Sequence, residues 1–80
     1  MRYQVTTKLS PPEALQRAIE HFGAQGVGLQ LVDQNEAGVS FTGGGGHVSI
    51  AACADNNHTT LEVETREWDY AVRQFMQRLG

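Results

Sequence analysis

Five short segments of this chain alternate apolar and polar residues, and two longer segments repeat apolar residues at helical spacing. Alternation is typical of a strand that is buried on one face, whereas helical spacing is typical of an amphipathic helix. In chain order the segments give β-α-β-β-β-β-α. This order predicts an α+β fold, in which a single antiparallel five-stranded sheet carries both helices packed on one face.

The expected strands include residues 2–9, 27–31, 39–41, 48–52 and 61–63. The first helix is expected to begin at Ser10, because Ser10 can cap its amino end and Glu13 completes a capping box. The second helix is expected to include Trp68 through Leu79. The simplest sheet order is second, third, fourth, fifth and first strand (2-3-4-5-1), with the first helix crossing from one edge strand to the other.

The lengths of the turns set which residues face each other across the sheet. Four-residue turns are expected at residues 43–46 and 54–57, and the second of them places Ile50 opposite Leu61. Around residues 33–37 the turn needs five residues or a bulge, because otherwise the second and third strands would turn their apolar residues to opposite faces. With these turns, all five strands agree on one apolar face.

Eighty residues are enough for one domain, and we assign residues 1–80 to it. A chain of this size buries only about 60% of the surface that its unfolded form exposes, so association would add stability. No apolar run approaches the roughly 20 residues of a membrane span. The single cysteine, Cys53, fits a reducing compartment. We therefore expect a cytoplasmic protein with no membrane partner.

The charge and the spacing of polar residues exclude several classes of partner. A formal net charge of −3, with six Lys and Arg residues, argues against nucleic-acid binding. Cys53, Asp55 and His58 lack the paired spacing of zinc sites. The glycines at residues 43–46 lead into a strand, whereas a phosphate-binding loop leads into a helix. We expect no metal and no cofactor.

The sheet face opposite the helices, called the open face from here on, is predicted to be mostly small and polar. Its residues are Gln4, Thr6, Lys8, Gln30, Val32, Ser40, Thr42, His47, Ser49, Ala51, Cys53, His58, Thr60, Glu62 and Glu64. Three interpretations stay open for such a face: ordinary exposure to solvent, contact with a partner such as a second copy of the chain, and a site for a small molecule.

The predicted registers place His47 opposite Glu64, and Ser49 opposite Glu62. A carboxylate beside an imidazole favours the charged form of the imidazole, and such a pair can act as a general base. Cross-strand His–Glu pairs are more often plain surface contacts. We therefore take these four residues as a candidate ligand-binding site and assign no catalytic residue.

The element order from Tyr3 through Leu79 resembles the TATA-binding-protein-like fold, and it is similar to a shortened helix-grip domain of the Bet v 1 type. The first resemblance implies DNA binding on the open sheet. The arginines, lysines and wedge phenylalanines that this needs are missing from the open face, so we do not carry DNA binding over. The second implies an apolar ligand between sheet and helix, for which this chain is short.

These observations favour a non-catalytic module that associates with itself or binds a partner. The first strand is expected at a sheet edge, where unpaired backbone groups allow pairing with a second copy, and the open face offers another surface for a homodimer. The alternative is a module that binds a small polar ligand on the open face. A weaker alternative is an enzyme that uses His47 and Glu64 as a general-base pair.

Overall fold

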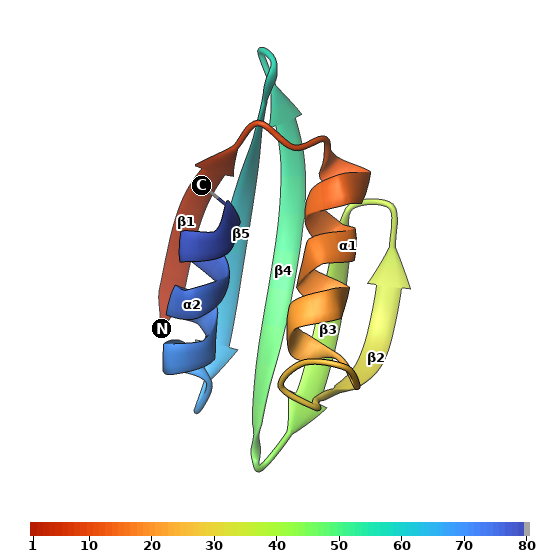
Figure 1. Cartoon of the computed structure of the whole chain (residues 1–80), viewed down its shortest axis with the longest axis vertical. Helices are drawn as coiled ribbons and strands as arrows, with labels where there is room; N and C mark the ends of the chain where they lie inside the picture. The colour runs from red at the N-terminus through yellow and green to blue at the C-terminus, as the bar shows by residue number, and fades with distance from the viewer. Residues whose placement is uncertain (80) are drawn as a thin grey trace.

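The structure is a computed structural model and describes residues 1–79. Its elements are β1 (Arg2–Thr7), α1 (Pro11–Phe22), β2 (Gln30–Asn35), β3 (Gly38–Gly43), β4 (Gly46–Asp55), β5 (His58–Arg66) and α2 (Asp69–Leu79). The five strands form one antiparallel sheet in the order β1-β5-β4-β3-β2 (Figure 1). The predicted α+β class, element order and sheet order are confirmed.

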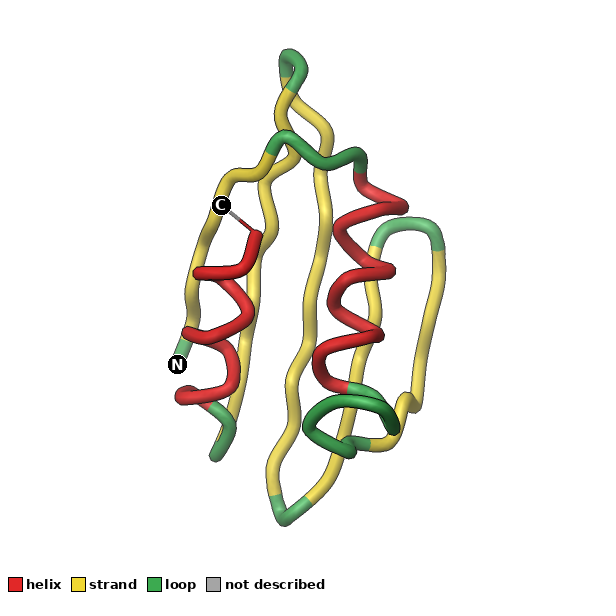
Figure 2. Tube along the Cα trace, in the orientation of Figure 1, coloured by secondary structure: helices red, strands yellow, loops and turns green. Residues whose placement is uncertain are grey.

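Both helices lie on the same face of the sheet, as the tube in Figure 2 shows. α1 packs on β3 and β4, and α2 packs on β5. β1 and β2 form the two edges, so α1 connects one edge of the sheet to the other, as expected (Figure 1). Among residues 1–79 no helix is long and apolar enough to cross a membrane.

Aromatic rings fill the centre of the space between the sheet and the helices. Phe22 of α1 packs against Phe41 of β3 and Phe75 of α2, with ring centroids 5.6 and 5.2 Å apart. All three rings are fully buried. The helix-grip resemblance implies an apolar ligand in this space, but here the protein's own side chains occupy it.

The predicted phase of the central strands is confirmed by the burial of neighbouring residues. Ile50 and Val63 are 2% and 1% exposed, whereas Ser49 is half-buried and Glu62 is exposed. Burying one face of each strand separates these residues, because successive side chains of a strand point to opposite faces. On these central strands the open face therefore carries the polar residues that the alternation predicts.

The register between β4 and β5 differs from the prediction by two residues. Ile50 lies opposite Val63, not Leu61. The turn contains only Asn56 and Asn57, both with positive φ (43° and 68°), as a type I′ hairpin requires. The predicted four-residue turn was therefore wrong. An even shift leaves every side chain on its predicted face.

The other two hairpins also show what the alternation could and could not fix. Gly44 and Gly45 alone form the turn between β3 and β4, so the four-residue turn predicted there was wrong, although Thr42 still pairs with His47. β2 begins at Gln30, later than predicted. It pairs with β3 through a bulge at residues 31–33, one of the two solutions that the phase demanded.

The start of α1 follows its sequence signal. The Ser10 hydroxyl accepts a hydrogen bond from the Glu13 backbone N–H at 3.4 Å and donates one to the Glu13 carboxylate at 2.9 Å. The predicted cap is therefore confirmed, and Pro11 occupies the first helical position, where no N–H donor is needed.

Candidate functional site

The open face is hollowed rather than flat. A depression of about 550 Å³ runs across all five strands. Its floor is made by residues with small side chains or none, which are Gly38, Ser40, Ser49 and Ala51. Longer polar side chains on β1, β5 and β2 form its rim: Arg2, Gln4, Asp33, Asn35, Glu62 and Glu64. The hollow therefore follows from residue size, small at the centre of the sheet and large toward its edges.

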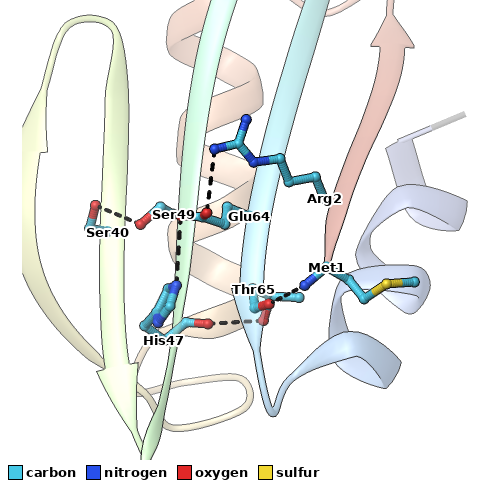
Figure 3. Close-up of polar contacts among 7 residues, drawn as sticks. All are labelled: Met1, Arg2, Ser40, His47, Ser49, Glu64 and Thr65. Carbon is cyan, nitrogen blue, oxygen red and sulfur yellow. Dashed lines mark hydrogen bonds and ion pairs between the residues drawn. The ribbon is translucent and has the colours of Figure 1, made fainter.

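Glu64 lies between two basic side chains on this face (Figure 3). Its carboxylate Oε1 is 3.8 Å from His47 Nε2, and its Oε2 is 3.6 Å from Arg2 Nη2. Directly across the ladder, however, His47 faces Arg66 and Glu64 faces Ser49. The predicted opposition of His47 and Glu64 was wrong, yet the two residues meet along the diagonal, which long side chains can span.

This cluster is a weak candidate for general-base chemistry. The side chains of His47 and Glu64 are 43% and 51% exposed, and such pairs contribute little energy in water. Arg2 competes with His47 for the same carboxylate. The Ser49 hydroxyl accepts a 3.4 Å hydrogen bond from the Ser40 hydroxyl (Figure 3). His47 is solvated and shares the Glu64 carboxylate with Arg2. The cluster is therefore better suited to binding a polar group than to activating a nucleophile.

The structure unites three of the four predicted site residues around the hollow. Ser49 lies on its floor, and Glu62 and Glu64 stand on its rim. Glu62 faces Ala51 across the ladder, not Ser49 as predicted. His47 lies outside the hollow and reaches it only through its contact with Glu64.

Three residues of the rim are absent from the predicted open face: Arg2 at the start of β1, and Asp33 and Asn35 on β2. Asp33 and Asn35 line the hollow from β2, whereas strict alternation placed Val32 on this face. The bulge after Leu31 reverses the phase, so Asp33 pairs with Ser40 on the open face. The alternation predicts a bulge or a five-residue turn in this region, but it does not locate the bulge. The position of the bulge decides which residue of β2 faces the hollow.

The outer edge of β1 is the second notable surface. Met1 and Thr65 exchange two backbone hydrogen bonds of 2.8 and 2.9 Å. Bonded and non-bonded pairs alternate along an antiparallel ladder, so every second residue from Met1 onward bonds to β5. The residues between them direct their N–H and C=O groups away from the sheet; they are Arg2, Gln4 and Thr6. No strand lies beyond them among residues 1–79 (Figure 1).

Packing of the helix-facing side chains is also less complete at the β1 edge. Tyr3 and Val5 of β1 are half-buried, whereas their β5 partners Val63 and Leu61 are fully enclosed. The Tyr3 hydroxyl donates a 2.6 Å hydrogen bond to the Asp69 carboxylate of α2. The core therefore thins toward this edge, with apolar side chains still reachable from outside.

A shallow groove of about 240 Å³ lies between the helices and contains a second histidine. His21 Nε2 lies 3.0 Å from the Ala71 carbonyl oxygen, which can only accept, so Nε2 carries the proton. Burial lowers the pKa of His21, and the Arg78 charge lowers it further, against a raising effect of the Ala71 carbonyl. This histidine joins the two helices, and its lowered pKa favours the neutral imidazole.

Residues 1–79 contain no group of three or more His, Cys, Asp or Glu side chains arranged to hold a metal ion. The thiol of Cys53 is exposed on the open face. His58 lies in the following hairpin and contacts the carbonyl of Asn56. These residues stand apart from the hollow.

Comparison with known proteins leaves the function to be argued from this geometry. No protein-family model matches the chain, and no curated protein matches it.

Proposed function

We propose that this protein is a non-catalytic module that forms a homodimer by pairing the β1 strands of two copies. The supporting observation is the outward edge of β1, where the backbone groups of Arg2, Gln4 and Thr6 have no partner among residues 1–79. A regular strand with free backbone groups is a template for another strand. A second copy would satisfy these groups and cover the half-buried side chains of Tyr3 and Val5.

The two edges of the sheet differ in a way that favours β1. β2 is interrupted by the bulge at residues 31–33, and bulges protect edges from pairing. β1 pairs with β5 without a break over all six of its residues, and it contains no proline. Natural sheets protect edge strands that must stay unpaired. The unprotected edge of β1 therefore supports pairing with a second copy.

Size gives a second physical reason for association. An 80-residue domain has a small core, and a partner that binds only the folded state stabilises it by mass action. We place the module in the cytoplasm, because an exposed thiol at Cys53 suits a reducing compartment.

Sedimentation equilibrium tests this proposal. The wild-type chain is expected at twice its mass of 8.8 kDa. Gln4→Pro removes an outward N–H at the β1 edge without touching the ladder to β5, and it should give the monomer mass.

The matched control for this variant is Gln34→Pro on the β2 edge. Ala37 and Ala52 form a bonded pair, so the alternation turns the backbone of Gln34 away from β3. Gln34→Pro should therefore leave the dimer intact. A wild-type monomer at all concentrations, or loss of association in both variants, would contradict the proposal.

The hollow supports a second candidate function, the binding of a small polar ligand. Its rim carries Asp33, Glu62 and Glu64 against Arg2 alone, so a ligand with positive charge fits best. The hydroxyls of Ser40 and Ser49 would offer hydrogen bonds from the floor.

A thermal-shift screen against small amines, amino acids and nucleotides tests this second function. A ligand of the hollow raises the melting temperature of the wild type, and Ser49→Leu abolishes the gain because the larger side chain fills the floor. Gln30→Leu lies on the same face outside the hollow and keeps the gain. A screen without any shift, or equal shifts in both variants, would count against a site here.

A further inference from the structure

The direction of its backbone groups restricts how β1 could pair with itself. Arg2, Gln4 and Thr6 point outward, and the residues between them are already bonded to β5. Two antiparallel copies form hydrogen bonds only when outward residues face outward residues. The two-fold axis must therefore lie where a residue of β1 faces the same residue of the second copy. The allowed registers differ from one another by shifts of two residues.

We propose that the two-fold axis passes through Gln4, so that Gln4 faces Gln4 of the second copy and Arg2 faces Thr6. This inference rests on the dimer proposed above and adds its register. In this register every outward residue of both copies exchanges its backbone bonds with another. A shift by two residues in either direction leaves one outward residue of each strand without a partner.

The side chains on the helix-facing side agree with the same axis. A register centred on Gln4 places Tyr3 of one copy opposite Val5 of the other. Aromatic and β-branched residues form favourable cross-strand pairs. Both side chains are only half-buried in the single chain, so each would gain cover from the other.

Charges on α2 distinguish this register from its neighbours. Asp69 accepts a hydrogen bond from the Tyr3 hydroxyl, and the Arg73 charge lowers the pKa of the same hydroxyl, so both residues belong to the side of α2 near β1. At the other end of the strand, the Thr7 hydroxyl bonds the Leu79 carbonyl. β1 and α2 therefore run in the same direction, with Tyr3 level with the start of the helix.

The axis through Gln4 lies about 3.3 Å beyond Tyr3, or roughly two residues along α2. Along the direction of α2, the axis therefore lies midway between Asp69 and Arg73. The two-fold rotation then brings Asp69 of each copy level with Arg73 of the other. An axis through Tyr3 would bring the two Asp69 carboxylates level, and an axis through Val5 would bring the two Arg73 side chains level. Opposite charges favour the first arrangement, and like charges disfavour the other two.

Disulfide trapping tests the register. In a Cys53→Ser background, which removes the only native thiol, Gln4→Cys should cross-link rapidly on oxidation. Facing residues of a bonded pair have Cα atoms about 5.5 Å apart, within the disulfide range. Thr6→Cys alone should cross-link poorly, because the two copies of residue 6 would lie about 13 Å apart. Mixing Thr6→Cys with Arg2→Cys should restore the cross-link.

Charge swapping at the axis gives a readout that needs no disulfide. Gln4→Lys and Gln4→Glu should each weaken self-association about two- to five-fold, because like charges then face each other. Their equimolar mixture should associate as tightly as the wild type.

The outcomes separate the register from the dimer itself. The dimer stands but the register is overturned if the wild type sediments at twice its mass and Thr6→Cys alone cross-links efficiently. The same holds if the wild type is a dimer and mixing Gln4→Lys with Gln4→Glu does not strengthen association. A monomer mass for the wild type overturns both.

Discussion

The Tyr3 hydroxyl donates a 2.6 Å hydrogen bond to the Asp69 carboxylate, and this contact joins the first strand to the last helix. The hydrogen bond to Asp69 raises the pKa of Tyr3 above its ordinary 10.0, burial raises it further, and Arg73 acts in the opposite direction. The contact joins β1, which carries the proposed interface, to α2 of the same chain. Because it lies within one chain, its strength can be measured separately from association.

The pKa of Tyr3 gives the first prediction. A Tyr70→Phe variant leaves Tyr3 as the only tyrosine, and its absorbance should titrate above pH 10. Adding Asp69→Asn should lower that midpoint, because the neutral amide no longer favours the protonated phenol.

The sign of the linked stability follows from the same shift. A pKa raised in the folded state adds stability that is present below pH 10 and is lost as the pH rises through the folded value. Tyr3→Phe should therefore flatten the alkaline fall in stability. A Tyr3 midpoint at or below 10, unchanged by Asp69→Asn, would show that the hydrogen bond does not form.

The β3–β4 turn gives a second prediction from two adjacent glycines. Both have positive φ, +57° at Gly44 and +81° at Gly45, so an alanine costs about 1–2 kcal/mol of stability at either position. At Gly44 the new methyl group would also lie 2.9 Å from the ring of Trp68, whereas nothing lies within 4 Å at Gly45. Trp68 is held there by its 2.9 Å bond to the Gly43 carbonyl.

Gly44→Ala should therefore destabilise more than Gly45→Ala in urea unfolding, and it alone should shift the fluorescence of the single tryptophan. Equal costs and an unchanged emission for both variants would mean that Trp68 does not pack on this turn.

Most of the fold was predictable because it depends on the phase of short strands. Burial of Ile50 and exposure of Glu62 follow from alternation alone. Register depends instead on how a turn closes, and Asn56 and Asn57 close theirs in the left-handed region, two residues tighter than expected. Composition favours a turn at such a sequence, but it does not fix the length of the turn.

The candidate site was predictable only in part for the same reason. Glu64 and Ser49 share the open face by phase, but the two-residue shift moved Glu64 opposite Ser49 and made its contact with His47 diagonal. Asp33 lines the hollow because a bulge shifts the register of β2, and a periodic pattern does not show where a bulge lies. The hollow itself depends on side-chain sizes from all five strands, and which of these side chains lie next to one another is known only once the registers are known.

Neighbouring residues of β5 give a third prediction. Leu61 is fully buried, so Leu61→Ala should cost about 2–5 kcal/mol of stability through lost burial and a cavity. Glu62 turns to solvent, and Glu62→Ala should change stability by less than about 0.5 kcal/mol. Urea unfolding of the two variants checks the phase of the sheet. Similar costs at both positions would mean that β5 is not buried on one face.

His21 gives a fourth prediction, on acid stability. Its pKa is lowered in the folded state, mainly by burial, so the folded state favours the neutral imidazole. The stability from this group is present above its ordinary pKa of 6.5 and is lost as the pH falls below that value. The groove around it adds charge from Arg17, Glu20 and Arg78.

His21→Gln keeps a donor for the Ala71 carbonyl but cannot gain a proton. Its stability should fall less than that of the wild type between pH 7 and 5, as measured by urea midpoints. His58→Gln, at an exposed hairpin, serves as the control and should follow the wild type. Identical pH profiles for all three proteins would contradict a neutral, helix-joining His21.

Residue-level amide hydrogen exchange at β1 is the most direct measurement of self-association through this edge. In a single chain the amides of Val5 and Thr7 are bonded to β5, while those of Gln4 and Thr6 face outward. We expect all four to be protected at high protein concentration, and the protection of Gln4 and Thr6 alone to disappear on dilution. Fast exchange of Gln4 and Thr6 at every concentration, beside slow exchange of Val5 and Thr7, would contradict pairing through β1.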